Sequence, residues 1–153
     1  MDGGEVVDRG LAVGLTAFAG GLIAMQAPIN GRLGSATGGV QAALFSFLVG
    51  GAALAVFALV FAGGFSGLGE VRSVPTTYLL GGFCGAIYVV TALTAVKTLG
   101  AGGVTVATIA GQLTLSILID QFGWFGVEKN PISATRLLGV LVLALGVWLV
   151  VRD

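Results

Sequence analysis

The sequence is poor in the residues that usually carry chemistry. Histidine is absent from the 153 residues, and Cys84 is the single cysteine. The first absence excludes imidazole proton relays and histidine metal sites, and the second excludes an internal disulfide and a cysteine metal cluster. Charged residues make up only 9% of the chain, and seven basic side chains balance seven acidic ones. We therefore expect no enzyme activity, no cofactor and no nucleic-acid partner.

Apolar residues are present instead, at 56% of the chain and with a mean hydropathy of +1.05. This composition predicts an all-α integral membrane protein, because a soluble domain cannot keep so much apolar surface in water. A membrane-spanning helix needs roughly 20 apolar residues. Five segments meet that requirement: 11–31, 40–62, 76–96, 102–122 and 132–151. They predict a single five-helix transmembrane domain over residues 1–153 in the cell (plasma or inner) membrane.

The N-terminal segment carries Asp2, Glu5 and Asp8 against one base, Arg9. A secretory signal needs a cationic start and a small-residue cleavage site. We therefore expect the first span to be retained.

An odd number of spans puts the two termini on opposite faces of the membrane. A second copy inserted the other way up is then related to the first by an axis in the membrane plane, which is the symmetry of inverted-repeat transporters. The basic residues divide almost evenly between the faces: Arg9, Arg72, Lys129 and Arg136 on one, and Arg32, Lys97 and Arg152 on the other. Because an excess of Lys and Arg sets orientation, this balance favours insertion both ways. The alternative is that Arg9 and nearby acids, or a partner protein, fix one orientation.

In the first span, Gln26 and Asn30 are four residues apart and share a helix face. Pro28 lies between them, so we expect this helix to kink or to end early. Freed polar groups at membrane depth must be buried in protein or line a watery cavity. The two amides suit a binding site and a structural link to a neighbouring helix equally well.

Small residues follow one face of the second span and one face of the third. These residues are Ala42, Ser46, Gly50 and Ala53 in the second, and Gly81, Gly85, Tyr88, Ala92 and Ala95 in the third. Such faces are typical of close helix packing in lipid, as are Gly139 and Gly146 of the last span. Tyr88 is different, because its hydroxyl needs a partner at mid-membrane depth.

The fourth span carries a second polar face. Thr105, Thr108, Gln112 and Ser116 cover roughly 80° of the helix circumference. Asp120 lies close to this face and is the only acid within any span. An ionisable residue in a membrane segment indicates function, but a carboxylate at a helix C-terminus also needs a cationic partner. The candidates are Arg136 and, in an inverted second copy, Arg32, so Asp120 is interpreted as a structural ion pair or a proton-coupling group.

Four segments together resemble a known family. They are QAPINGRLG (26–34), GGFCGAIYVV (81–90), AGQLTLSILIDQFGWFG (110–126) and RLLGVLVLALGVWLV (136–150). The chain resembles, over nearly its whole length, the DUF606 (YdcZ-like) branch of the drug/metabolite transporter (DMT) superfamily. The resemblance implies a five-helix half-transporter, which occurs in the family as single chains, as products of paired genes, or fused into ten-helix proteins. The matching polar positions are Gln26, Asn30, Gln112 and Asp120.

The better-known four-helix multidrug exporters of that superfamily use a glutamate in their first helix to exchange cations for protons. This chain has no acid in its first span, so cation/proton antiport does not carry over. Neutral amides suit a polar neutral, zwitterionic or anionic metabolite at least as well.

The sequence therefore predicts half of a ten-helix inverted-repeat transporter, assembled as an antiparallel homodimer or with a paralogous half, that moves a small polar solute by alternating access. The predicted substrate-binding residues are Gln26, Asn30, Tyr88, Gln112 and Ser116. Two alternatives are a non-transporting interaction subunit of another membrane protein and a passive pore. Polar faces on two different helices favour transport over the interaction subunit.

Overall fold

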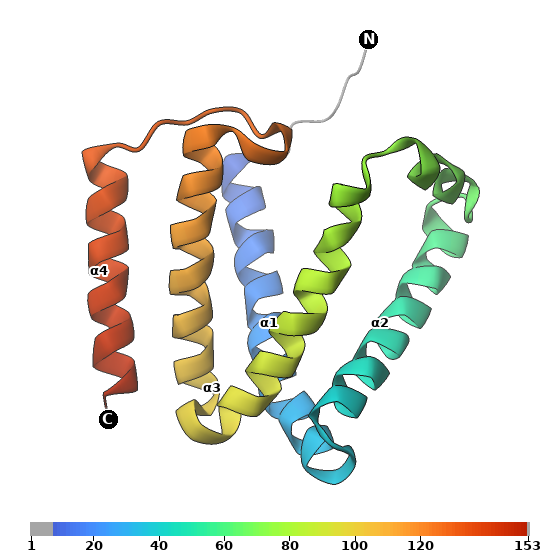
Figure 1. Cartoon of the computed structure of the whole chain (residues 1–153), viewed down its shortest axis with the longest axis horizontal. Helices are drawn as coiled ribbons and strands as arrows, with labels where there is room; N and C mark the ends of the chain where they lie inside the picture. Colours follow the sequence, from blue (N-terminus) through green and yellow to red (C-terminus); the bar gives the residue numbers. More distant parts are fainter. Residues whose placement is uncertain (1–7, 153) are drawn as a thin grey trace. The chain divides into compact units, whose positions relative to one another are not determined.

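The structure, a computed structural model, describes residues 8–152, and these residues form helices and no strand. The acidic positions Asp2 and Glu5 lie outside the described residues. The α-helices labelled in Figure 1 are α1 (Arg9–Thr37), α2 (Gly39–Phe61), α3 (Leu80–Phe122) and α4 (Ala134–Val151). Short 3₁₀ helices are η1 (Ser66–Ser73), η2 (Thr76–Leu79) and η3 (Trp124–Gly126). The all-helical prediction is confirmed.

Four helical segments are long and apolar enough to cross a bilayer, where the sequence predicts five. The difference lies in α3, which runs through the predicted spans 76–96 and 102–122 as one assigned helix of 43 residues. Gly100 interrupts it, with φ 67° and ψ 173°, which are not helical values. The helix thus has two parts of about 20 residues, each about the length that crosses a bilayer. The number of crossings stays a prediction.

α1 continues past Pro28 to Thr37. The expectation that this helix ends early is therefore wrong, and Arg32 lies within the helix. Proline removes one backbone hydrogen bond from a helix but is tolerated in membrane-spanning helices, where neighbouring groups satisfy the freed carbonyl. A single residue, Gly38, separates α1 from α2 and has φ 92°, a value that residues with a side chain rarely adopt.

The chain forms two compact units. The first, called here the central unit, is Met25–Lys97 and holds the end of α1, all of α2 and the first part of α3. The second, called here the terminal unit, comprises residues 8–24 and 98–152 of the described chain. The prediction of one five-helix domain stays a prediction.

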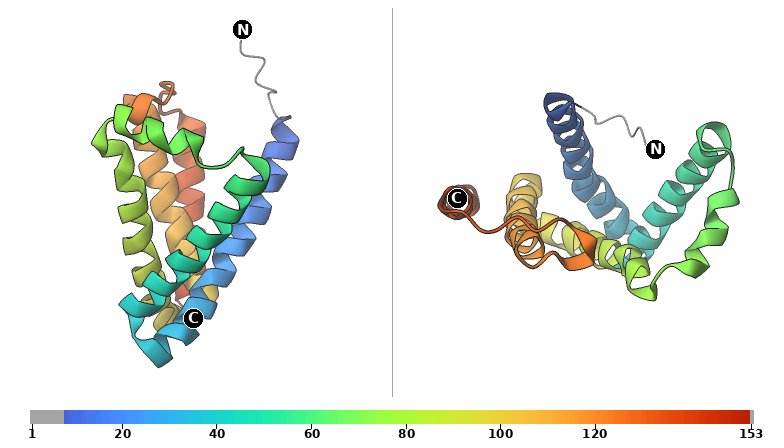
Figure 2. Two further views of the ribbon diagram at one scale, coloured as in Figure 1. Left: turned by 90° about the vertical axis from the view of Figure 1, so that its right-hand side faces the viewer. Right: turned by 90° about the horizontal axis from the view of Figure 1, so that it is seen from above.

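Within the central unit, α1 and α2 pack on α3 through small side chains. Leu93 is 2% exposed and forms a cluster with Ala42, Ala43 and Val89. At Gly31, an added Cβ would lie only 2.7 Å from a methyl group of Val96, so glycine permits this close approach. In both views of Figure 2, η1 and η2 (green) connect the end of α2 to the start of α3.

Within the terminal unit, α4 lies beside the second part of α3 (Figures 1 and 2). The two helices are joined by a connection that starts at Gly123, whose φ of 68° ends α3 in a left-handed turn. Ser133 begins α4, because its hydroxyl accepts a hydrogen bond from the backbone N–H of Arg136 at 3.2 Å. Most large apolar side chains of α4 are exposed, as suits a surface that meets lipid or another chain.

Candidate functional site

The central unit brings three of the predicted site residues together. Gln26, Asn30 and Tyr88 line one small cavity between α1 and α3, with room for about one water molecule (about 10 Å³). The sequence places Gln26 and Asn30 on one helix face, and this grouping is what the structure shows. Tyr88 joins them from α3, because α1 crosses α3 at this level.

Asn30 is buried, with 7% of its surface exposed. Its side-chain amide donates a hydrogen bond to the hydroxyl oxygen of Ser46 at 3.2 Å, and this bond links α1 to α2. The amide therefore satisfies a structural need, which was one of the two interpretations left open by the sequence. Leaving such a group unpaired in a buried position would cost about 1–3 kcal/mol.

A larger cavity of about 320 Å³, open to the surface, also borders Gln26, whose side chain is exposed. Its polar lining comes from Gln26 and Ser46, and its apolar lining from Phe47, Leu54 and Val89. Two adjacent glycines of α2, Gly50 and Gly51, complete the wall. No lining residue of either cavity carries a charge.

Sequence reasoning assigned Ser46 and Gly50 to helix packing and did not assign Phe47 or Gly51 to any role. A signal for Ser46 was available, because α2 contains only two polar side chains, Gln41 and Ser46. Ser46 is the one of these in the interior of the helix, where a hydroxyl in lipid needs a partner. No comparable signal marked the two glycines as cavity lining, since packing uses the same residue type.

The terminal unit holds the other predicted residues. Gln112 is exposed and forms no hydrogen bond with the residues that the structure describes. The hydroxyl of Ser116 donates to the backbone carbonyl of Leu113 at 3.0 Å, within its own helix. The predicted roles of Gln112 and Ser116 in solute binding stay predictions.

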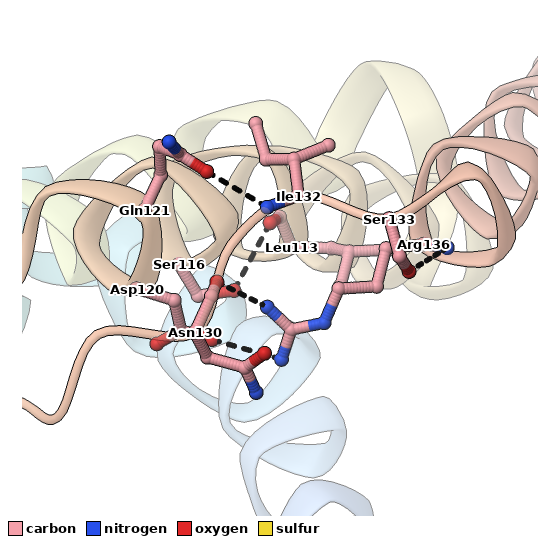
Figure 3. A network of polar contacts seen from close by, with 8 residues as sticks. All are labelled: Leu113, Ser116, Asp120, Gln121, Asn130, Ile132, Ser133 and Arg136. Atoms are coloured by element: carbon pink, nitrogen blue, oxygen red, sulfur yellow. Dashed lines mark hydrogen bonds and ion pairs between the residues drawn. The ribbon is translucent and has the colours of Figure 1, made fainter.

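Asp120 is paired with Arg136 at 3.1 Å, so the first of the two candidate partners is confirmed. Arg136 also donates to the backbone carbonyl of Asn130 at 3.2 Å, and the backbone N–H of Asn130 donates to the carbonyl of Asp120 at 2.9 Å. Figure 3 shows the Asp120 carboxylate, from the end of α3, and the Asn130 carbonyl, from the connection, both in contact with the guanidinium.

A further contact ties the same connection to α3. The side-chain oxygen of Gln121 accepts a hydrogen bond from the backbone N–H of Ile132 at 2.7 Å (Figure 3). The predicted acid and its base thus form part of a network that holds the turn between two helices. The network gives Asp120 a cationic partner within the same chain.

A comparison with protein families matches residues 11–149 to the family described as "Putative inner membrane exporter, YdcZ". The chain belongs to the YdcZ family. Searches of curated proteins and of solved structures returned no match to it.

Membership of the YdcZ family, together with the apolar helices, makes this chain a multi-pass inner-membrane protein of a transporter family. The family is one of membrane exporters and not of enzymes. The resemblance drawn from the four sequence segments is therefore confirmed at the level of the family.

Proposed function

We propose that this YdcZ-family protein is one half of a ten-helix transporter that assembles as an antiparallel homodimer, or with a paralogous half, and moves a small polar solute by alternating access. The single observation that carries the proposal is the interruption of α3 at Gly100. As one straight helix, α3 would be about 65 Å long, about twice the thickness of the hydrocarbon core. Two crossings in place of one raise the total from four to five.

Five crossings leave the termini on opposite faces, and two oppositely inserted copies then form an inverted repeat. The distribution of basic residues supports insertion both ways, because the five-crossing arrangement puts four on one face and three on the other. The single five-helix domain of residues 1–153 is part of the same proposal.

The proposed solute site starts from Gln26 and Tyr88 of the central unit. Neither side chain forms a hydrogen bond with residues 8–152, and both line a cavity. Unpaired polar groups in an apolar surrounding are costly, so a bound solute that pairs with them gains affinity. Asn30 supports this site by positioning Ser46. Gln112 and Ser116 are proposed as the contribution of the fourth crossing.

Asp120 is proposed to have a structural role, because Arg136 and the connection already occupy its carboxylate and backbone carbonyl. A proton-coupling role would need a carboxylate that is free to exchange its partner during transport. The family description supports export as the direction of transport.

Cysteine labelling tests the topology on which the proposal depends. Cys84→Ala removes the native thiol, and Gly69→Cys then introduces one in η1, where an added Cβ meets nothing within 4 Å. A membrane-impermeant maleimide should label Gly69→Cys from both sides of the membrane in comparable amounts. Ala36→Cys, near the end of α1, is the matched site for the opposite face. A single orientation of the chain expressed alone would overturn the homodimer.

Two added lysines beside Gly69 should then trap one orientation and lower transport, and co-expression of an oppositely biased variant should restore it. A solute for this assay comes from thermal-shift screening of the purified protein against metabolites, since a ligand of the native state raises its stability. Saturable flux supports a transporter. Flux that rises linearly with concentration indicates a pore, and binding without flux indicates an interaction subunit.

A further inference from the structure

The 320 Å³ cavity beside Gln26 has a polar end and an apolar remainder. At the polar end, the Gln26 carboxamide offers both donors and an acceptor, and it has no partner among the described residues. Ser46 accepts from Asn30, so its own hydroxyl hydrogen remains available to donate. This end can hydrogen-bond to a ligand but cannot neutralise one.

The apolar part owes its space to Gly50 and Gly51. An added Cβ at either position would meet nothing within 4 Å, and neither glycine has a positive φ. No backbone requirement therefore explains them, although each glycine in a helix costs roughly 1 kcal/mol relative to alanine. Gly50 and Gly51 leave space beside the backbone of α2, and this space is part of the cavity.

Phe47 forms a wall of the same space. The tip of its ring lies 3.3 Å from the position of a Cβ at Gly85 on α3, so the ring spans from α2 to α3. Leu54 and Val89 add aliphatic surface. A flat apolar group can lie against the glycine backbone and the ring at once, and the volume is at the lower end of the range for small-molecule pockets.

We infer that this cavity binds an uncharged solute with a planar apolar part, which lies over Gly50 and Gly51 while its hydrogen-bonding group pairs with Gln26. The inference rests on the proposed transport function and narrows its substrate class. The lining offers an ion no counter-charge, whereas its hydrogen-bonding groups can pair with a neutral solute. Cationic, anionic and zwitterionic solutes should therefore bind in this cavity more weakly than a neutral one.

Three probes that share one ring system test the charge class. They are indole, which is neutral and has one N–H donor, tryptamine, which is cationic, and indole-3-acetate, which is anionic. Equilibrium dialysis against the full chain in nanodiscs, with empty nanodiscs subtracted, should show saturable binding of indole. The two charged probes should bind at least tenfold more weakly. Absence of saturable indole binding, or charged probes that bind as tightly, would overturn the inference.

Gly50→Leu locates the site, because its side chain has room to enter the cavity without a clash. It should abolish indole binding, whereas Gly82→Leu, an equally uncrowded glycine of α3 outside the cavity lining, should leave binding unchanged. Gln26→Leu should weaken indole binding about two- to tenfold, as expected for one lost neutral hydrogen bond. If Gly50→Leu leaves indole binding unchanged, the probe binds elsewhere. If Gln26→Leu leaves it unchanged, the cavity is an acyl-chain groove. Either result rejects the assignment.

These measurements need no gradient and no flux, so they separate the two proposals. Saturable indole binding that responds to Gly50→Leu in a protein that transports nothing would overturn the transport function and leave the cavity assignment intact. Transport of a metabolite that Gly50→Leu does not affect would overturn only the cavity assignment.

Discussion

The central unit and the terminal unit are held together by different means. In the central unit, small residues let helices approach until Leu93 is almost fully buried, and one neutral hydrogen bond crosses between α1 and α2. In the terminal unit, Val104 is the one buried apolar side chain of those that the structure describes. Its α3–α4 connection is held instead by the Asp120–Arg136 network.

This difference fits the physics of helices in lipid. Hydrocarbon tails are as apolar as leucine, so packing of small residues and polar contacts must provide the association that the hydrophobic effect provides in water. The central unit relies mainly on the first and the terminal unit on the second. The uncharged cavity lies in the packed unit, whereas the ion pair lies in the other.

The largest expected effect tests whether the central unit depends on side-chain packing more than the terminal unit does. Leu93→Ala should lower the free energy of unfolding by about 2 kcal/mol, the low end of the range for buried leucines. In lipid the variant loses van der Waals contacts, but it loses no free energy of transfer from water, because the lipid is as apolar as the protein interior. Leu141→Ala, at a position on α4 that is 60% exposed, should stay within about 0.5 kcal/mol of the parent. Unfolding by SDS in mixed micelles measures both. Equal losses would contradict the difference between the units.

A smaller effect is expected for the bond between α1 and α2. Asn30→Leu should cost about 0.5–1.5 kcal/mol, since one neutral hydrogen bond is lost and Ser46 is left without its donor. A double-mutant cycle with Ser46→Ala isolates the pair. The double variant should lose less stability than the sum of the two single losses. If the two losses are simply additive, Asn30 does not stabilise the unit through Ser46.

The smallest effect is expected in the terminal unit. Asp120 and Arg136 are 27% and 31% exposed, so Asp120→Asn should cost about 0.2–1 kcal/mol. The loss should largely disappear in an Arg136→Gln background, as a cycle on unfolding would show. The matched control is Arg32→Gln, which removes the other predicted partner. Coupling of Asp120 to Arg32 in place of Arg136 would indicate the pairing across two copies.

The sequence by itself determined most of the helix limits. The predicted spans 40–62 and 132–151 correspond to Gly39–Phe61 and Ala134–Val151, because the length of an apolar run and its flanking glycines, Ser133 and polar residues act locally. The sequence left Arg136 and Arg32 open as partners for Asp120, and the structure shows the pair with Arg136, because a short connection returns the chain to the end at which α3 stops.

The tertiary structure decided what depends on helix crossings. The proline alone does not decide whether its helix ends, since α1 continues past Pro28 to Thr37. Periodicity puts Asn30 and Ser46 on faces of two helices, but only the packing of α1 on α2, close at Gly34 and Ala42, brings them within hydrogen-bonding distance. Glycine in a membrane helix permits either contact or empty space. At Gly31 another helix fills the space beside the backbone, and at Gly50 that space is a cavity. The sequence shows only that glycine has no side chain there, and the position of the neighbouring helix decides whether the space is filled.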